Sequence, residues 1–151
     1  MIAPLLAAAL AFACHPAAVR TGAYAGEQAG LHAVPWVATS NGAFAGHLFY
    51  WGGTRFGRGG ARTASILTVG ASRRINPKVL WIARERTASP TLTIAGRRLD
   101  APGSFRTTRP RADGPLAQFP SYVEIPAAGC WRVTVSAGSL SGSVVFAAYD
   151  R

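Results

Sequence analysis

The chain has few acidic side chains. Six carboxylates stand against 16 basic residues among 151, and the formal net charge is +10 at pH 7. A pair of carboxylates facing one another, as glycosidases use, is not indicated, because most of the six lie in expected loops or near the termini beside arginines. The excess of positive charge predicts attraction to anionic polymers that weakens with salt. A solvated basic surface without a dedicated partner is the alternative.

Patterns that carry metal, cofactor or catalytic chemistry are also missing. The three histidines, His15, His32 and His47, are far apart in sequence, and none stands at a metal-ligand spacing from Cys, Asp or Glu. There is no G-x-S-x-G elbow, Walker loop or dinucleotide fingerprint, and the glycine-rich stretch 52–60 lacks the Lys-Ser/Thr ending of a phosphate cradle. We therefore predict a non-enzymatic protein with no catalytic residue, no metal and no cofactor.

Helical spacing is absent too. After residue 13, no window of 11 or more residues combines the apolar period of a helix with caps. Short apolar or alternating segments separated by Gly, Pro and polar turns predict strands instead. We expect them at 31–39, 43–51, 63–69, 79–83, 90–95 and 122–125, followed by a hairpin over 129–150. Residues 79–83 are apolar on both phases, as in a strand with both faces covered. From 96 to 119, prolines and glycines predict an irregular segment.

About eight strands in a chain long enough for one domain predict an all-β fold. The alternating strand that contains Trp131, Val133 and Val135 needs a second layer over its apolar face. We predict an immunoglobulin-like antiparallel β-sandwich of about seven or eight strands over residues 31–151, with a small β-barrel as the alternative. Residues 14–30 are small and polar and predict a flexible tether.

Residues 1–13 contain no charged side chain, and the eleven residues 2–12 are apolar. A bilayer span needs about 20 such residues, so this run is typical of a secretory signal peptide. The stretch Leu10-Ala11-Phe12-Ala13-Cys14 resembles a bacterial lipobox, which implies lipidation at Cys14, attachment to the membrane and an extracytoplasmic location. Ordinary cleavage nearby and a retained segment are the alternatives.

The second cysteine depends on the fate of the first. With a lipid on Cys14, Cys130 would have no partner within the chain and would be a small buried thiol. Without processing at Cys14, an oxidising compartment would permit a disulfide between Cys14 and Cys130. A catalytic cysteine is not indicated, because nothing around Cys130 suggests a nearby histidine or a helix N-terminus.

A resemblance to known domains comes from the second half of the chain. The run 125–135, IPAAGCWRVTV, resembles a motif near the end of bacterial immunoglobulin-like domains, where Pro and Gly precede an aromatic residue that opens a strand. Together with KVLWI at 78–82 and GRRLD at 96–100, it is similar to secreted or lipid-anchored bacterial proteins that carry such a domain. The resemblance implies the fold and carries no catalytic residue over to this sequence.

Two basic turns suggest a binding site. Guanidinium groups suit phosphate and carboxylate, and aromatic rings stack on sugars. We predict that these turns meet at one end of the sandwich and bind an anionic polysaccharide or other anionic envelope polymer. The predicted ligand-binding residues are Arg55, Arg58, Arg62, Arg73, Arg74, Trp51 and Phe56. Separate solvated arginines and core aromatics would give the same pattern.

A second hypothesis is a structural or protein-interaction module of the cell envelope that docks through a sheet edge or an aromatic face. Tyr50, Trp51 and Tyr122 are the candidate anchors, whereas Trp81 and Trp131 are expected in the core. Salt dependence separates the two hypotheses, since polymer binding weakens steeply with ionic strength. Nucleic acid is disfavoured as a partner, because the leader directs the protein out of the cytoplasm and no basic helix is expected.

Overall fold

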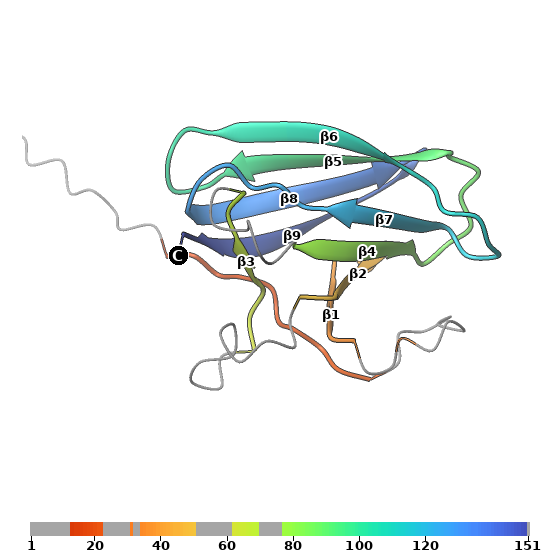
Figure 1. Ribbon diagram of the computed structural model, residues 1–151, viewed down its shortest axis with the longest axis horizontal. Helices are drawn as coiled ribbons and strands as arrows, with labels where there is room; N and C mark the ends of the chain where they lie inside the picture. Colours follow the sequence, from red (N-terminus) through yellow and green to blue (C-terminus); the bar gives the residue numbers. More distant parts are fainter. Residues whose placement is uncertain (1–12, 23–30, 32–33, 51–61, 70–76, 151) are drawn as a thin grey trace, which may run out of the picture.

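The computed structural model describes residues 13–22, 31, 34–50, 62–69 and 77–150 (Figure 1). These residues form strands and no helix, which confirms the all-β prediction. The strands are β1 (Trp36–Ala38), β2 (Phe44–Leu48), β3 (Ser65–Leu67), β4 (Lys78–Ala83), β5 (Thr91–Arg98), β6 (Ser104–Pro110), β7 (Gln118–Tyr122), β8 (Gly129–Ala137) and β9 (Leu140–Tyr149).

The described strands form two sheets. One has the order β1-β2-β4-β7, and the other has the order β3-β9-β8-β5-β6. All pairs are antiparallel except β3 with β9, which run parallel with Ser65 opposite Ala147. The expectation of purely antiparallel pairing was wrong at this one edge. β3 and β9 are far apart in sequence, and local alternation carries no information on the direction of such a pair.

A single apolar core lies between the sheets. Trp81, Phe44 and Phe119 come from the four-stranded sheet, and Trp131 and Phe146 come from the five-stranded sheet. Trp81 is 0% exposed and Trp131 is 1% exposed, so the prediction that both belong to the core is confirmed. Alternation along β5, β8 and β9 places every second side chain in this core, as the period of two requires.

The C-terminal hairpin is also confirmed. β8 and β9 pair from Gly129 opposite Ala148 to Ala137 opposite Leu140. The reversal needs only two residues, Gly138 and Ser139, and Gly138 has a φ of 60°, which glycine adopts without strain.

The segment 96–119 is more regular than the sequence predicts. β5 continues to Arg98, and Ser104–Pro110 forms β6, the edge strand beside it. No residue of β6 is fully buried, so its pattern lacks the apolar alternation by which strands are recognised. Prolines are compatible with this position because an edge strand has one unpaired side. Pro120 lies in β7, the edge of the other sheet, for the same reason.

The N-terminal residues are attached to the sheets. The Ala17 N–H donates to the Val145 carbonyl (2.9 Å), and the Val19 N–H donates to the Arg62 carbonyl. Arg20 and Trp36 exchange two backbone hydrogen bonds of 2.7 and 2.9 Å. The flexible tether expected over 14–30 is therefore wrong for residues 17–20, which satisfy the backbone groups of sheet edges.

Cys14 and Cys130 form a disulfide, with Cα atoms 5.6 Å apart. Of the alternatives for Cys14, the structure has the disulfide, and its sulfur is therefore not available for a lipid in this form of the protein. Cys130 is buried as expected, but it is bonded rather than a free thiol. Among the described residues there is no helix with the length and apolarity needed to cross a membrane.

Candidate functional site

Most of the predicted ligand-binding residues lie outside the described part of the chain. This applies to Arg55, Arg58, Arg73, Arg74, Trp51 and Phe56. Arg62 is described and exposed, and its backbone carbonyl accepts the hydrogen bond from Val19. A binding site at the basic turns therefore stays a prediction.

The outer face of the five-stranded sheet carries three exposed arginines. Arg97 on β5 lies directly opposite Arg132 on β8, and Arg106 on β6 lies opposite Ala95 on β5. Side chains directly opposite on antiparallel strands have Cβ atoms about 5 Å apart, and diagonal neighbours are separated by about 7–8 Å. Arg97 is therefore a neighbour of both Arg132 and Arg106, which lie on either side of β5. We call this surface the arginine face.

No carboxylate occupies the arginine face among the paired residues of β5, β6, β8 and β9. The positions that share it with the arginines are Thr91, Thr93, Ala95, Ser104, Thr108, Pro110, Thr134, Ser136, Ser141, Ser143, Val145 and Ala147, together with Cys130, which is bonded to Cys14, and Tyr149, which is 53% exposed. Two hydroxyl pairs, Thr134 with Ser143 (2.7 Å) and Ser136 with Ser141 (3.0 Å), join β8 to β9. Most of these side chains are shorter than arginine, and the N-terminal segment reaches the face beside Arg132, through the Cys14–Cys130 disulfide.

The acid nearest in sequence to this face has its own partner. Arg98 Nε donates to Asp100 Oδ1 at 2.8 Å in the turn after β5. This hydrogen bond holds the pKa of Asp100 below its ordinary value. The Arg98–Asp100 contact is the one ion pair between described residues. Arg97, Arg106 and Arg132 therefore have no carboxylate partner in that part of the chain.

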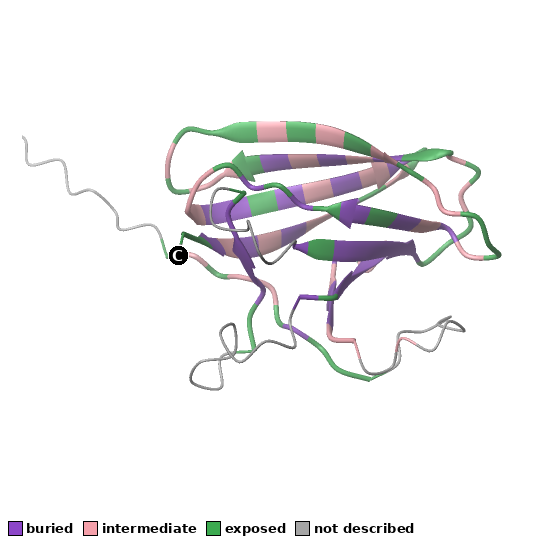
Figure 2. Ribbon diagram, in the orientation of Figure 1, coloured by how far each residue is buried: buried purple, intermediate pink, exposed green. Residues whose placement is uncertain are grey.

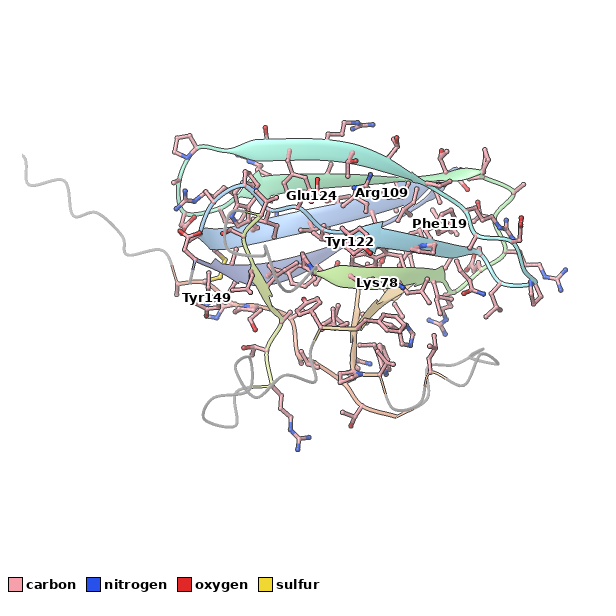
Figure 3. The ribbon with its side chains drawn as sticks, in the orientation of Figure 1. Lys78, Arg109, Phe119, Tyr122, Glu124 and Tyr149 are labelled. Carbon is pink, nitrogen blue, oxygen red and sulfur yellow. A yellow bond between two sulfur atoms is a disulfide. The ribbon has the colours of Figure 1, made fainter. Side chains whose placement is uncertain are left out.

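The outer face of the four-stranded sheet carries an exposed row of three side chains. Phe49 is 42% exposed and Tyr122 is 43% exposed. Lys78 lies between them: its Nζ is 5.1 Å from the Phe49 ring centroid, and it is opposite Tyr122 (Figure 3). We call these three residues the aromatic row.

Of the candidate aromatic anchors, Tyr122 alone is described and exposed. Tyr50 is 7% exposed, its hydroxyl donates to the Ser65 carbonyl (3.0 Å), and burial raises the pKa of its phenol. The suggestion that Tyr50 anchors a partner was therefore wrong, since its ring is part of the core. Trp51 lies outside the described residues.

Groups for metal binding are not assembled in the described part of the chain, where no three His, Cys, Asp or Glu side chains could hold an ion. His47 is buried on the outer side of β2, with its ring centroid 6.4 Å from that of Trp36. His15 is exposed beside Cys14, and His32 is not described.

Comparison with protein-family models, with curated proteins and with solved structures gave no match. The arginine face was missed by sequence reasoning because Arg97 and Arg106 were placed in an irregular segment. The sequence signal for this face was the alternation of inward and outward positions along the strands. Arg97, Arg106 and Arg132 all fall on the outward positions of their strands, and correct strand boundaries would have put them on one surface.

Proposed function

We propose that the protein is a non-enzymatic extracytoplasmic binding module whose arginine face contacts an anionic envelope polymer. The observation that carries this proposal is the sheet face on which Arg97, Arg106 and Arg132 are exposed without a carboxylate among their described neighbours. A guanidinium group presents a planar fork of donors that fits a carboxylate or phosphate bidentately. Three forks at neighbouring positions suit an extended chain with repeated anionic groups.

We also propose that the sandwich is immunoglobulin-like. In that fold, strands A, B and E lie together in one sheet and strands C, F and G lie together in the other. The order β2-β4-β7 corresponds to A-B-E, and the order β5-β8-β9 corresponds to C-F-G. β6 then extends the second sheet beyond the strand that corresponds to C, and it contributes Arg106 to the arginine face.

Export from the cytoplasm is supported by the disulfide. Disulfides persist in oxidising compartments and are rare where thiols are kept reduced. A lipid on Cys14 and the bond to Cys130 require the same sulfur atom, so one molecule carries one or the other. We propose that the disulfide-bonded form is exported. Membrane attachment through Cys14 stays a prediction, which the intact mass of protein from membranes tests by the presence of a diacylglyceryl group.

The binding proposal is tested by comparing two triple variants with the same loss of charge. Arg97→Gln/Arg106→Gln/Arg132→Gln removes the arginine face, and Arg55→Gln/Arg58→Gln/Arg62→Gln removes the predicted loop arginines. Affinity for heparin, measured by titration at several salt concentrations, should fall by about tenfold or more in the first variant at low salt. Its dependence on salt should also become weaker, because fewer counterions are released.

The control decides between three explanations. A loop variant that binds like the wild type supports the arginine face. A loop variant that loses as much affinity as the face variant shows that net charge alone attracts heparin, and it overturns the assignment of the site. A loss of heparin affinity in the loop variant alone would show that the basic turns form the binding site.

The aromatic row supports a second candidate function, a docking surface for another envelope protein. Two rings exposed by more than two fifths on one sheet face are typical of an interface centre. Binding through this row should change little with salt and should be lost in Phe49→Ser/Tyr122→Ser. If this variant retains full binding to a captured partner, the row does not contribute to the interface.

A further inference from the structure

A hollow of about 480 Å³ opens between two loops at one end of the sandwich. One loop, residues 84–90, joins β4 to β5, and the other, residues 111–117, joins β6 to β7. Both loops lie at the right of Figure 1, away from the C-terminus. The lining residues are Arg86, Thr87, Ala88, Arg111, Pro115 and Ala117. The hollow is wide open to solvent, so a ligand bound in it stays partly exposed.

Hydrogen bonds hold the two loops in place without a ligand. The Arg111 guanidinium donates from Nη1 to the Thr87 carbonyl, and the Arg111 N–H donates to the Pro90 carbonyl at 2.8 Å. The Ala83 N–H donates to the Ala117 carbonyl at 3.0 Å, which fixes Ala117 as a buried part of the wall. Because the loops are already held in place, binding a ligand in this hollow costs little free energy for ordering the protein.

The polar groups that remain for a ligand are cationic. Arg86 and Arg111 line the hollow, and no carboxylate does. Neither arginine forms an ion pair with any described acid. The Thr87 hydroxyl is already engaged, because it donates to the Ala137 carbonyl (3.4 Å) and accepts from the Ser89 N–H (3.2 Å). The ligand therefore has to supply negative charge rather than donors.

The rest of the wall is apolar. Ala88, Pro115 and Ala117 contribute aliphatic surface beside the two guanidinium groups. A free inorganic anion would leave this surface in contact with water, whereas a short aliphatic group would cover it. A carboxylate is planar and matches the guanidinium fork.

We propose that the hollow binds a small carboxylate that carries a compact apolar group, with Arg86 and Arg111 as the carboxylate-binding residues. This inference goes beyond the proposed function and does not depend on it. The arginine face and the hollow use different arginines, so each site can be removed while the other is kept.

Three matched ligands test the chemistry on the full, disulfide-bonded chain. N-acetylalanine has the carboxylate and a methyl group, N-acetylalaninamide lacks the charge, and inorganic phosphate lacks the apolar group. Followed by amide chemical shifts, N-acetylalanine should saturate a single site and shift residues of both loops. The amide should cause no saturable shift. A saturable site for the amide, or tighter binding of phosphate than of N-acetylalanine, would overturn the proposal.

Two variants locate the site. Arg86→Gln should weaken N-acetylalanine about tenfold, because it removes one of the two guanidinium groups proposed to bind the carboxylate. Arg86 is exposed, so the variant is expected to fold. Ala88→Phe keeps both charges and should abolish binding by filling the hollow. Arg132→Gln on the arginine face is the control, and it should leave N-acetylalanine binding unchanged while weakening heparin. Unchanged affinity in Arg86→Gln would show that the ligand binds elsewhere.

Discussion

The outer faces of the two sheets differ sharply. On the four-stranded sheet, Trp36, Ala45, His47, Leu80 and Ile82 point away from the central core, yet all are buried. On the five-stranded sheet, the outward positions of β5, β6 and β8 are hydroxylic, small or arginine, and apart from the disulfide-bonded Cys130 they are half-buried or exposed. Figure 2 shows the contrast as burial along β4 after its exposed first residue, Lys78, against alternation along β5 and β8.

The difference explains why the two sheets look unlike in sequence. A strand with both faces covered needs apolar residues at successive positions, as in β4 from Val79 to Ala83, whereas a strand with one wet face alternates. Leu31 and Ala38 pack against the outer cluster of the four-stranded sheet, and the N-terminal segment pairs with Trp36 at its edge. The outer face of the four-stranded sheet is covered over β1, β2 and most of β4 and is exposed at the aromatic row, whereas the outer face of the five-stranded sheet presents arginines to solvent.

Removing the disulfide should have the largest effect on this comparison. The bond closes a separation of 116 residues and ties the N-terminal segment to the start of β8. Cys14→Ser/Cys130→Ser should lower the free energy of unfolding by about 3–5 kcal/mol, since a long loop in the unfolded chain is released. Urea titration measures the loss. Hydrogen exchange should increase at Arg20 and Trp36 more than in β5, and equal increases in both would contradict a local role of the N-terminal segment.

A matched pair of outward-facing substitutions should give the next largest effect. Leu80→Ala on the four-stranded sheet removes buried apolar volume and should cost about 2–3 kcal/mol of unfolding free energy. Thr93→Ala on the five-stranded sheet should cost less than about 1 kcal/mol, because its side chain is only half-buried. Thermal or urea unfolding of both variants is the measurement. Equal costs would show that the two outer faces do not differ as described.

The smallest expected effect concerns the arginines themselves. Like charges directly opposite on neighbouring strands destabilise a sheet, and Arg97 faces Arg132. Arg132→Gln should therefore raise the free energy of unfolding by about 0.2–1 kcal/mol at low salt. High salt should remove the gain, because screening shortens the range of the repulsion. Arg106→Gln is the control, since Arg106 lies opposite Ala95 and should give a smaller gain.

A gain in stability for Arg132→Gln would mean that the repulsion between Arg97 and Arg132 destabilises the native sheet. Residues kept against stability are expected at binding surfaces. A loss of stability in Arg132→Gln would instead show that the arginines stabilise the sheet, and it would weaken the case for a binding face.

Sequence reasoning was most successful where one face of a strand is buried against the other sheet. The alternation around Trp131, Val133 and Val135 predicted the C-terminal hairpin, and the apolar run 79–83 predicted a strand covered on both faces. It failed at β6, an edge strand whose outward residues are polar and whose inward residues are only half-buried. The candidate site was affected by this failure, because Arg106 lies on β6.

The N-terminal region shows a second kind of limit. Small, polar residues at 14–30 predicted a tether, but backbone hydrogen bonds to sheet edges do not depend on side-chain type. Nothing in the composition of residues 17–20 distinguishes a segment that pairs from one that does not.

The sequence by itself determined the strand-rich architecture, the two core tryptophans and the excess of positive charge, because each depends on local period, residue volume or simple counting. Tertiary structure alone decided that Arg97 faces Arg132, that Cys14 bonds to Cys130, and that two loops line an open hollow to which Arg86 and Arg111 both contribute. These are contacts between residues far apart in the chain. They follow from the register and order of the strands, which alternation along one strand does not specify.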